Sequence, residues 1–180
     1  MPKPANGNAR GFATIPNGRS IATQIMAEER TVGAAYYGTH PEVLSRLLSD
    51  LTPEERRRVR HLDPAENACV EERSLNRYPQ TGGRLEFPDD SVVERRKADT
   101  EVEAADLLAK WVNTHIDPET EVVAMWGNYV VPSLAMPSKV LADHAGAVVA
   151  SSSDVWVYAD RESLIIERFH DGRTTLARVG

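Results

Sequence analysis

Residues 151–180 constrain the fold more than any other part of the chain, because they predict three short strands joined by tight turns. The predicted strands are 151–160, 163–169 and 173–179, and they are rich in β-branched and aromatic residues. Asp171-Gly172 is a favoured hairpin turn, since both residue types tolerate a positive φ. A chain that closes on such a three-stranded meander contains an antiparallel sheet, and other elements must cover it. We therefore expect an α+β fold.

Helical patterns dominate the sequence before this meander. Apolar residues at helical spacing, or capping signals, predict helices over 19–30, 40–51, 53–62, 64–76, 100–116 and 138–144. Thr52, Asp63 and Thr100 are each followed three residues later by a glutamate, which is the capping-box pattern. The apolar stripe expected on 100–116 includes Val102 and His115, and Gly146 is the expected stop after the last of these helices.

The remaining strands are expected to complete a sheet of about five strands. Segment 84–87 and segment 91–94 are expected to pair as a hairpin. Segment 121–126 is expected to pair with 129–131 across a Gly127-Asn128 turn, and Pro132 and Pro137 are expected to frame a linker. The prediction is a helical N-terminal half packed on a mostly antiparallel sheet.

The domain prediction follows from composition along the chain. Residues 1–18 are rich in proline, glycine and asparagine and are expected to form a mobile arm. Residues 19–180 are expected to form a single α+β domain, with a possible helical subdomain over 19–77.

Charge and composition narrow the function classes. The formal net charge of −6 makes nucleic acid an unlikely partner, because nucleic-acid binding depends on lysine and arginine at phosphates. Cys69 is the one cysteine, so no intramolecular disulfide can form and a cysteine-based zinc site is not expected. No metal, cofactor or membrane partner is expected, and the sequence at residues 1–8 lacks a signal-peptide core, so the expected location is cytoplasmic.

A basic run, Arg56-Arg57-Arg58 with Arg60 and His61 beyond it, has two interpretations. It is either a solvated helix face or a docking patch of a regulatory or phage-encoded adaptor.

Five residues are candidates for partner binding: Trp126, Asp154, Trp156, Tyr158 and His170. In the strand 155–158, Trp156 and Tyr158 share one face and the two valines share the other. The aromatic side chains either pack in the core or are exposed as interface anchors. The alternative is a small enzyme, with a site assembled from Asp154, His170 and a serine of 151–153. That alternative predicts a concave pocket that contains a carboxylate or histidine with a perturbed pKa.

The last third of the chain resembles small bacterial immunity proteins that accompany polymorphic or contact-dependent toxins. The resemblance rests on Trp126-Gly127, Val130-Val131-Pro132, the run Ser151-Ser-Ser-Asp-Val-Trp156, and Phe169-His170-Asp-Gly-Arg-Thr-Thr175. It implies a protein-binding inhibitor that neutralises a cognate toxin by occlusion. A negative charge would increase the rate at which such an inhibitor associates with a basic toxin.

Overall fold

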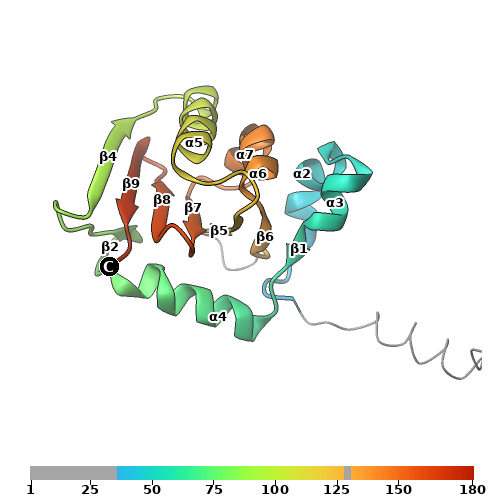
Figure 1. The fold of residues 1–180 in the computed structure, drawn as a ribbon, viewed down its shortest axis with the longest axis horizontal. Coiled ribbons are helices and arrows are strands. Elements are labelled where there is room, and N and C mark those ends of the chain that lie inside the picture. The colour runs from blue at the N-terminus through green and yellow to red at the C-terminus, as the bar shows by residue number, and fades with distance from the viewer. Residues whose placement is uncertain (1–35, 128–130) are drawn as a thin grey trace, which may run out of the picture. The chain divides into compact units, whose positions relative to one another are not determined.

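A seven-stranded antiparallel sheet organises the protein in the computed structural model, which describes residues 36–127 and 131–180 (Figure 1). These residues belong to one structural unit, Ala35–Gly180. The strand order is β1-β6-β5-β7-β8-β9-β4. The strands are β1 Arg60–His61, β4 Val92–Lys97, β5 Glu121–Trp126, β6 Leu134–Pro137, β7 Val155–Ala159, β8 Leu164–Arg168 and β9 Arg173–Arg178. A separate two-stranded hairpin consists of β2 Gln80–Thr81 and β3 Arg84–Leu85.

The C-terminal meander predicted from the sequence is confirmed. β7 pairs with β8, and β8 pairs with β9, through consecutive antiparallel registers. The second turn places Gly172 at φ +87°, a conformation that side chains with a Cβ rarely adopt. The α+β class follows from this sheet together with the helices around it.

Three helices begin where the capping signals placed them, whereas the helix at 145–150 was not predicted. The helices are η1 Pro41–Leu44, α2 Ser45–Asp50, α3 Pro53–Arg58, α4 Pro64–Arg73, η2 Leu75–Arg77, α5 Glu101–His115, α6 Ser138–Asp143 and α7 Ala145–Ala150, where η denotes a 3₁₀ helix. Capping boxes begin α3 at Thr52, α4 at Asp63 and α5 at Thr100. In each box the cap side chain and the glutamate three residues later satisfy backbone N–H groups that no helical carbonyl can reach.

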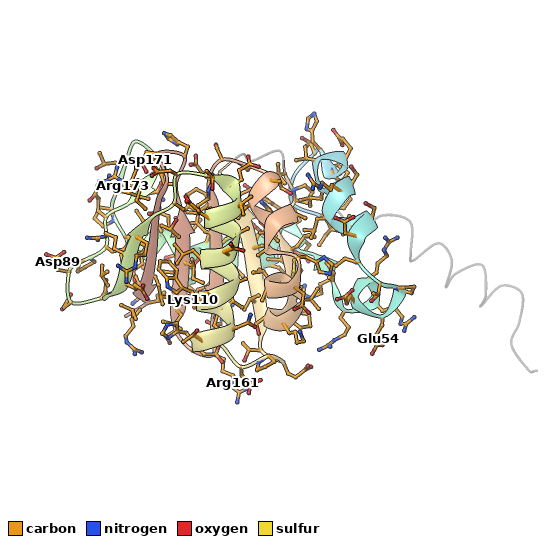
Figure 2. The ribbon with its side chains drawn as sticks, turned by 90° about the horizontal axis from the view of Figure 1, so that it is seen from above. Glu54, Asp89, Lys110, Arg161, Asp171 and Arg173 are labelled. Atoms are coloured by element: carbon orange, nitrogen blue, oxygen red, sulfur yellow. The ribbon has the colours of Figure 1, made fainter. Side chains whose placement is uncertain are left out.

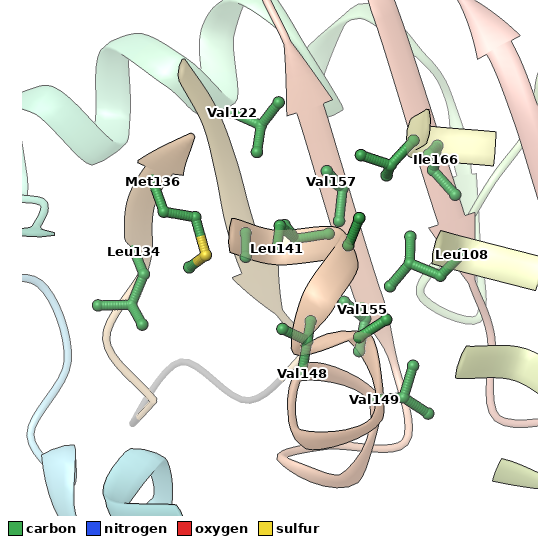
Figure 3. Packing of buried hydrophobic residues seen from close by; sticks show 14 of the residues in the cluster. Leu108, Val122, Leu134, Met136, Leu141, Val148, Val149, Val155, Val157 and Ile166 are labelled. Carbon is green, nitrogen blue, oxygen red and sulfur yellow. The ribbon is translucent and has the colours of Figure 1, made fainter. Parts of the chain in front are cut away.

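One face of the sheet is covered by α5, α6 and α7 (Figure 1). Its core contains Leu108 from α5, Leu141 from α6 and Val148 from α7, which pack on Val155 and Val157 of β7 (Figure 3). Burial of this many aliphatic side chains is the main stabilising contribution to the fold, at about 25 cal/mol per Å² of apolar surface removed from water.

The opposite face of the sheet is also covered. Figure 1 shows α4 running along this face toward the β2–β3 hairpin. Leu62, Val70 and Leu85 pack there with Trp156 and Tyr158 of β7. All five residues of β7 are therefore buried. Its side chains alternate between the two faces of the sheet as predicted, and each face belongs to a separate core.

Several predicted boundaries are wrong. The helix expected over 53–62 ends at Arg58, and Arg60–His61 instead forms β1, which pairs with β6. Segment 91–94 does not pair back on 84–87, because β4 pairs with β9 at the edge of the sheet. The segment between Pro132 and Pro137 is not a linker, since Leu134–Pro137 is the buried strand β6 and pairs with β5. The sheet consequently has seven strands rather than about five.

Two further corrections concern helices. Gly146 does not stop the chain's last helical region, because it lies inside α7. Val102 does not belong to the apolar stripe of α5, since 70% of it is exposed. The predicted arm at 1–18, the predicted helix at 19–30 and the turn and strand start at 128–130 lie outside the described residues.

Candidate functional site

Asp154 and His170, two of the residues singled out from the sequence, are in contact. Asp154 Oδ1 accepts hydrogen bonds from the His170 backbone N–H at 2.7 Å and lies 3.0 Å from His170 Nδ1. The backbone contact joins the residue before β7 to the end of the β8 strand region, so the meander itself positions the pair. A carboxylate on one imidazole nitrogen orients the ring and leaves Nε2 for another partner.

The serines expected beside this pair are not part of it. The Ser151 hydroxyl donates to the Ala147 carbonyl of α7 at 2.8 Å. The Ser153 carbonyl accepts from Arg168. Among the described residues, no hydrogen bond joins a hydroxyl of 151–153 to His170, so the nucleophile–base arrangement of the enzyme alternative is not assembled here.

The three aromatic candidates are core residues. Trp126 is 5% exposed and its Nε1 donates to the Val148 carbonyl at 3.1 Å. Trp156 is 9% exposed and Tyr158 is 4% exposed, because α4 and the hairpin cover their face of the sheet. The interpretation in which these aromatic side chains are exposed as interface anchors is therefore wrong. A partner-binding role for Asp154 and His170 stays a prediction.

Trp156 contacts the buried carboxylate of Glu167, a residue that the sequence did not single out. Trp156 Nε1 donates to Glu167 Oε1 at 3.0 Å, and the Leu85 N–H of β3 donates to the same oxygen at 2.9 Å. Glu167 is only 2% exposed. Burial is the largest effect on its pKa and raises it, outweighing the two hydrogen bonds, which favour the ionised form.

Glu167 lines a cavity of about 220 Å³ between the sheet and the hairpin segment. The sheet registers place Glu167 of β8 opposite Thr175 of β9, and Thr175 opposite Arg95 of β4. These three residues form one row across the floor of the cavity. The hairpin segment closes it from above with Leu85 and Phe87, so we name this site the Glu167 cavity.

Three arginines from three strands line the Glu167 cavity. Arg84 of β3 pairs with Glu86 at 2.8 Å, and Arg173 of β9 pairs with Asp171, its neighbour in Figure 2, at 2.7 Å. The hydrogen bond to Arg173 lowers the pKa of Asp171. Arg95 of β4 has the longest of these contacts, since its ion pair within the described part of the chain is to Asp89 at 4.0 Å.

A larger groove of about 420 Å³ lies between α4 and the sheet. Leu62, Val70 and Val123 give it an apolar floor, and Cys69 is exposed there. Tyr158 also lines it and donates from its hydroxyl to Asp160 Oδ1 at 2.5 Å.

Ionic contacts already engage the polar groups of that groove. Burial, followed by the hydrogen bond to Asp160, raises the pKa of Tyr158 to about 12. Arg73 binds Asp160 at 2.7 Å, and Arg60 binds Glu66 at 2.8 Å and Glu121 at 3.2 Å. The groove's basic groups are thus paired with its own carboxylates.

The basic run is partly paired with carboxylates. Arg56 donates to the Leu48 carbonyl, Arg58 pairs with Glu119, and Arg60 has the two carboxylates described above. Carboxylates therefore neutralise two of the four arginines of the run, which reduces the positive charge on which the adaptor interpretation depends.

The described surface is acidic instead. Two carboxylate residues and four basic residues lie within residues 1–35, so residues 36–180 contain 25 carboxylate and 17 basic residues, a formal charge of −8. Among the described residues, the side chains of six exposed carboxylate residues form neither an ion pair nor a hydrogen bond: Glu42, Asp50, Glu54, Asp90, Glu101 and Asp106. Glu101 and Asp106 flank the exposed Val102 in the first turns of α5.

Two kinds of feature are absent from residues 36–127 and 131–180. No group of three or more histidine, cysteine, aspartate or glutamate side chains is arranged to hold a metal ion. None of the helices there is long and apolar enough to cross a membrane. Comparison of the chain with protein-family models and with curated protein sequences gave no match.

Proposed function

We propose that this protein binds a basic bacterial toxin and neutralises it by occlusion, as an immunity-type inhibitor. The observation that carries the proposal is the surplus of exposed carboxylates on the described surface, of which six form neither an ion pair nor a hydrogen bond with a described residue. The likeness of the last third of the chain to immunity proteins is a second, independent support.

The physical role of this surplus is to attract the partner before contact. Complementary net charge raises association rates well above the roughly 10⁵–10⁶ M⁻¹s⁻¹ typical of uncharged surfaces at low salt. Mobile ions screen such attraction within about 8 Å at physiological ionic strength. An inhibitor that must reach a toxin before the toxin acts gains directly from a faster encounter.

We propose the start of α5 as part of the contact surface. Val102 is the most exposed of the large hydrophobic residues among those described, and Glu101 and Asp106 flank it without ion pairs. An apolar residue surrounded by acidic groups fits a basic partner, because the apolar contact gains from burial while the acidic rim sets orientation.

The experiment captures partners with the full chain, then tests each stoichiometric partner for toxicity when expressed alone and for rescue by co-expression. Association rates are measured from low to high salt for the wild type and for the double variant Glu101→Gln/Asp106→Asn. We expect slower association and a weaker salt dependence for this variant. The control, Glu71→Gln/Glu72→Gln on α4, removes the same charge elsewhere. A toxic partner whose association rate does not change with salt contradicts the steering argument, and rescue failure contradicts the function.

A second candidate function is a small enzyme with a site at the C-terminal sheet. The Glu167 cavity favours it, because that cavity is a concave site containing a carboxylate of raised pKa, as the enzyme alternative predicted. Its test is whether the cavity takes a small molecule at all, and the chemistry of the cavity indicates which class of molecule to try.

A further inference from the structure

We infer that the Glu167 cavity binds a small α-amino acid, with the ammonium group on Glu167 and the carboxylate on Arg95. The inference does not depend on the proposed inhibitor function. It rests on the arrangement of one anionic and one cationic side chain in a row across the sheet, at opposite ends of a small polar cavity.

The anionic end has an unused oxygen. Both hydrogen bonds that the structure gives Glu167 end on Oε1, from Leu85 N–H and Trp156 Nε1. No described residue donates to Oε2, and no described basic side chain forms an ion pair with Glu167 within 4.0 Å. A carboxylate that is only 2% exposed and lacks a cation is costly to bury, so a bound ammonium would relieve that cost.

The cationic end is Arg95. Arg84 and Arg173 are engaged by Glu86 and Asp171 at hydrogen-bond distance, whereas Asp89 lies at 4.0 Å from Arg95. Arg95 is therefore the guanidinium of the cavity with the most free donors. A guanidinium presents paired N–H groups that match the two oxygens of a carboxylate.

The spacing of the row suits one small zwitterion. Glu167 is on β8 and Arg95 is on β4, with only β9 between them, so their backbones are two strand spacings apart, or roughly 9.6 Å. Side chains on one face at this backbone spacing can bind the two ends of a single small ligand whose ammonium and carboxylate groups are adjacent. Thr175, between them in the row, offers a hydroxyl to either group. A volume of about 220 Å³ admits a small molecule and excludes a folded partner.

The charges of the cavity disfavour ligands that carry only one sign. A simple oxyanion would approach Glu167, and a simple amine would approach Arg95. A ligand that brings both charges, placed in opposite order to those of the cavity, is attracted at both ends.

The test is titration of the full chain with the proteinogenic L-amino acids, followed by NMR shifts of the Leu85 amide and the Trp156 indole. Propionate and ethylamine, which each lack one of the charged groups of alanine, are the ligand controls. We expect at least one amino acid to bind and neither control ligand to bind. Absence of binding by every amino acid at millimolar concentration overturns the inference.

Two variants test the roles of the two ends. Glu167→Gln keeps an oxygen for Leu85 and Trp156 and replaces only the free oxygen, and Arg95→Gln removes the guanidinium. Each is expected to weaken amino-acid binding by about tenfold or more. Arg96→Gln, on the other face of β4, is the matched control and is expected to bind like the wild type. Tighter binding of propionate by Glu167→Gln, without loss of amino-acid binding, would identify an anion site instead and overturn the inference. None of these measurements involves a toxin, so their failure leaves the inhibitor proposal standing, and the reverse also holds.

Discussion

At the scale of single residues, Glu167 combines burial, two donated hydrogen bonds and a free oxygen. The sequence contains it within the apolar strand Leu164–Arg168, where one charged residue would ordinarily lie on the solvated face of a sheet. The one available signal was register, because Glu167 lies opposite Trp156 on the face that β7 shares with Tyr158. That signal becomes informative only once α4 is known to cover this face.

The raised pKa of Glu167 makes the free energy of unfolding depend on pH. The folded state holds the Glu167 proton more tightly than the unfolded state, whose pKa is near 4.5. The stabilisation is therefore fully present below pH 4.5 and is lost as the pH rises through the folded value. The glutamine in Glu167→Gln cannot titrate, so the variant does not lose this stabilisation as the pH rises.

We accordingly expect the unfolding free energy of Glu167→Gln, relative to wild type, to increase between pH 4 and pH 7. Urea unfolding at a series of pH values measures the difference. A difference that is constant with pH would mean that the pKa of Glu167 is the same in the folded and unfolded states. Glu72→Gln, at an exposed position of α4, is the control for a glutamate outside the cavity.

At the scale of elements, capping and turn signals were the reliable part of the prediction. Thr52, Asp63 and Thr100 begin helices as expected, because a cap is decided by residues within one turn of it. Strands that form only by pairing with segments distant in the sequence were not predicted. Leu134–Pro137 follows Pro132 and ends at a proline, yet it forms β6. It does so because β1 and β5 pair with it on either side and both cores bury it.

Two glycines, one in a turn and one in a helix, differ in the space that they leave for a Cβ atom. A Cβ on Gly172 would lie 2.6 Å from the Ala98 carbonyl oxygen, at a φ of +87°. A Cβ on Gly146, inside α7, would meet nothing within 4 Å. We expect Gly172→Ala to destabilise the fold by about 1–3 kcal/mol. Gly146→Ala is expected to be neutral or to stabilise it by up to about 1 kcal/mol. Chemical denaturation of the two variants measures both effects, and equal effects would contradict this account.

At the scale of the whole molecule, the sheet ends in two different edges. One edge is β1, with only two residues, and the other is the six-residue β4. A long open edge can pair with another chain, and charged side chains are a common protection against it. β4 carries Glu94, Arg95, Arg96 and Lys97 in succession.

We expect Arg96→Thr/Lys97→Thr to associate with itself more strongly than the wild type, because this variant keeps a strand-forming edge and removes two charges from it. Sedimentation velocity over a range of protein concentrations is the measurement. Lys110→Thr/Arg161→Thr removes the same charge away from the sheet edge and is the control. Equal association of the two variants would show that net charge, and not edge protection, is responsible.

The pairing of β4 with β9 also determines when the Glu167 cavity can exist during folding. β7, β8 and β9 follow one another in the chain, so their meander needs only short loops to close. β5, β6, β7 and β8 and three helices separate β4 from β9 in sequence. Closing that long intervening segment carries a larger entropic cost, which slows the formation of distant contacts. Glu167 and Thr175 are thus expected to come together early, and Arg95 to join them late, so that a ligand of the cavity would distinguish the finished molecule from a partly folded one.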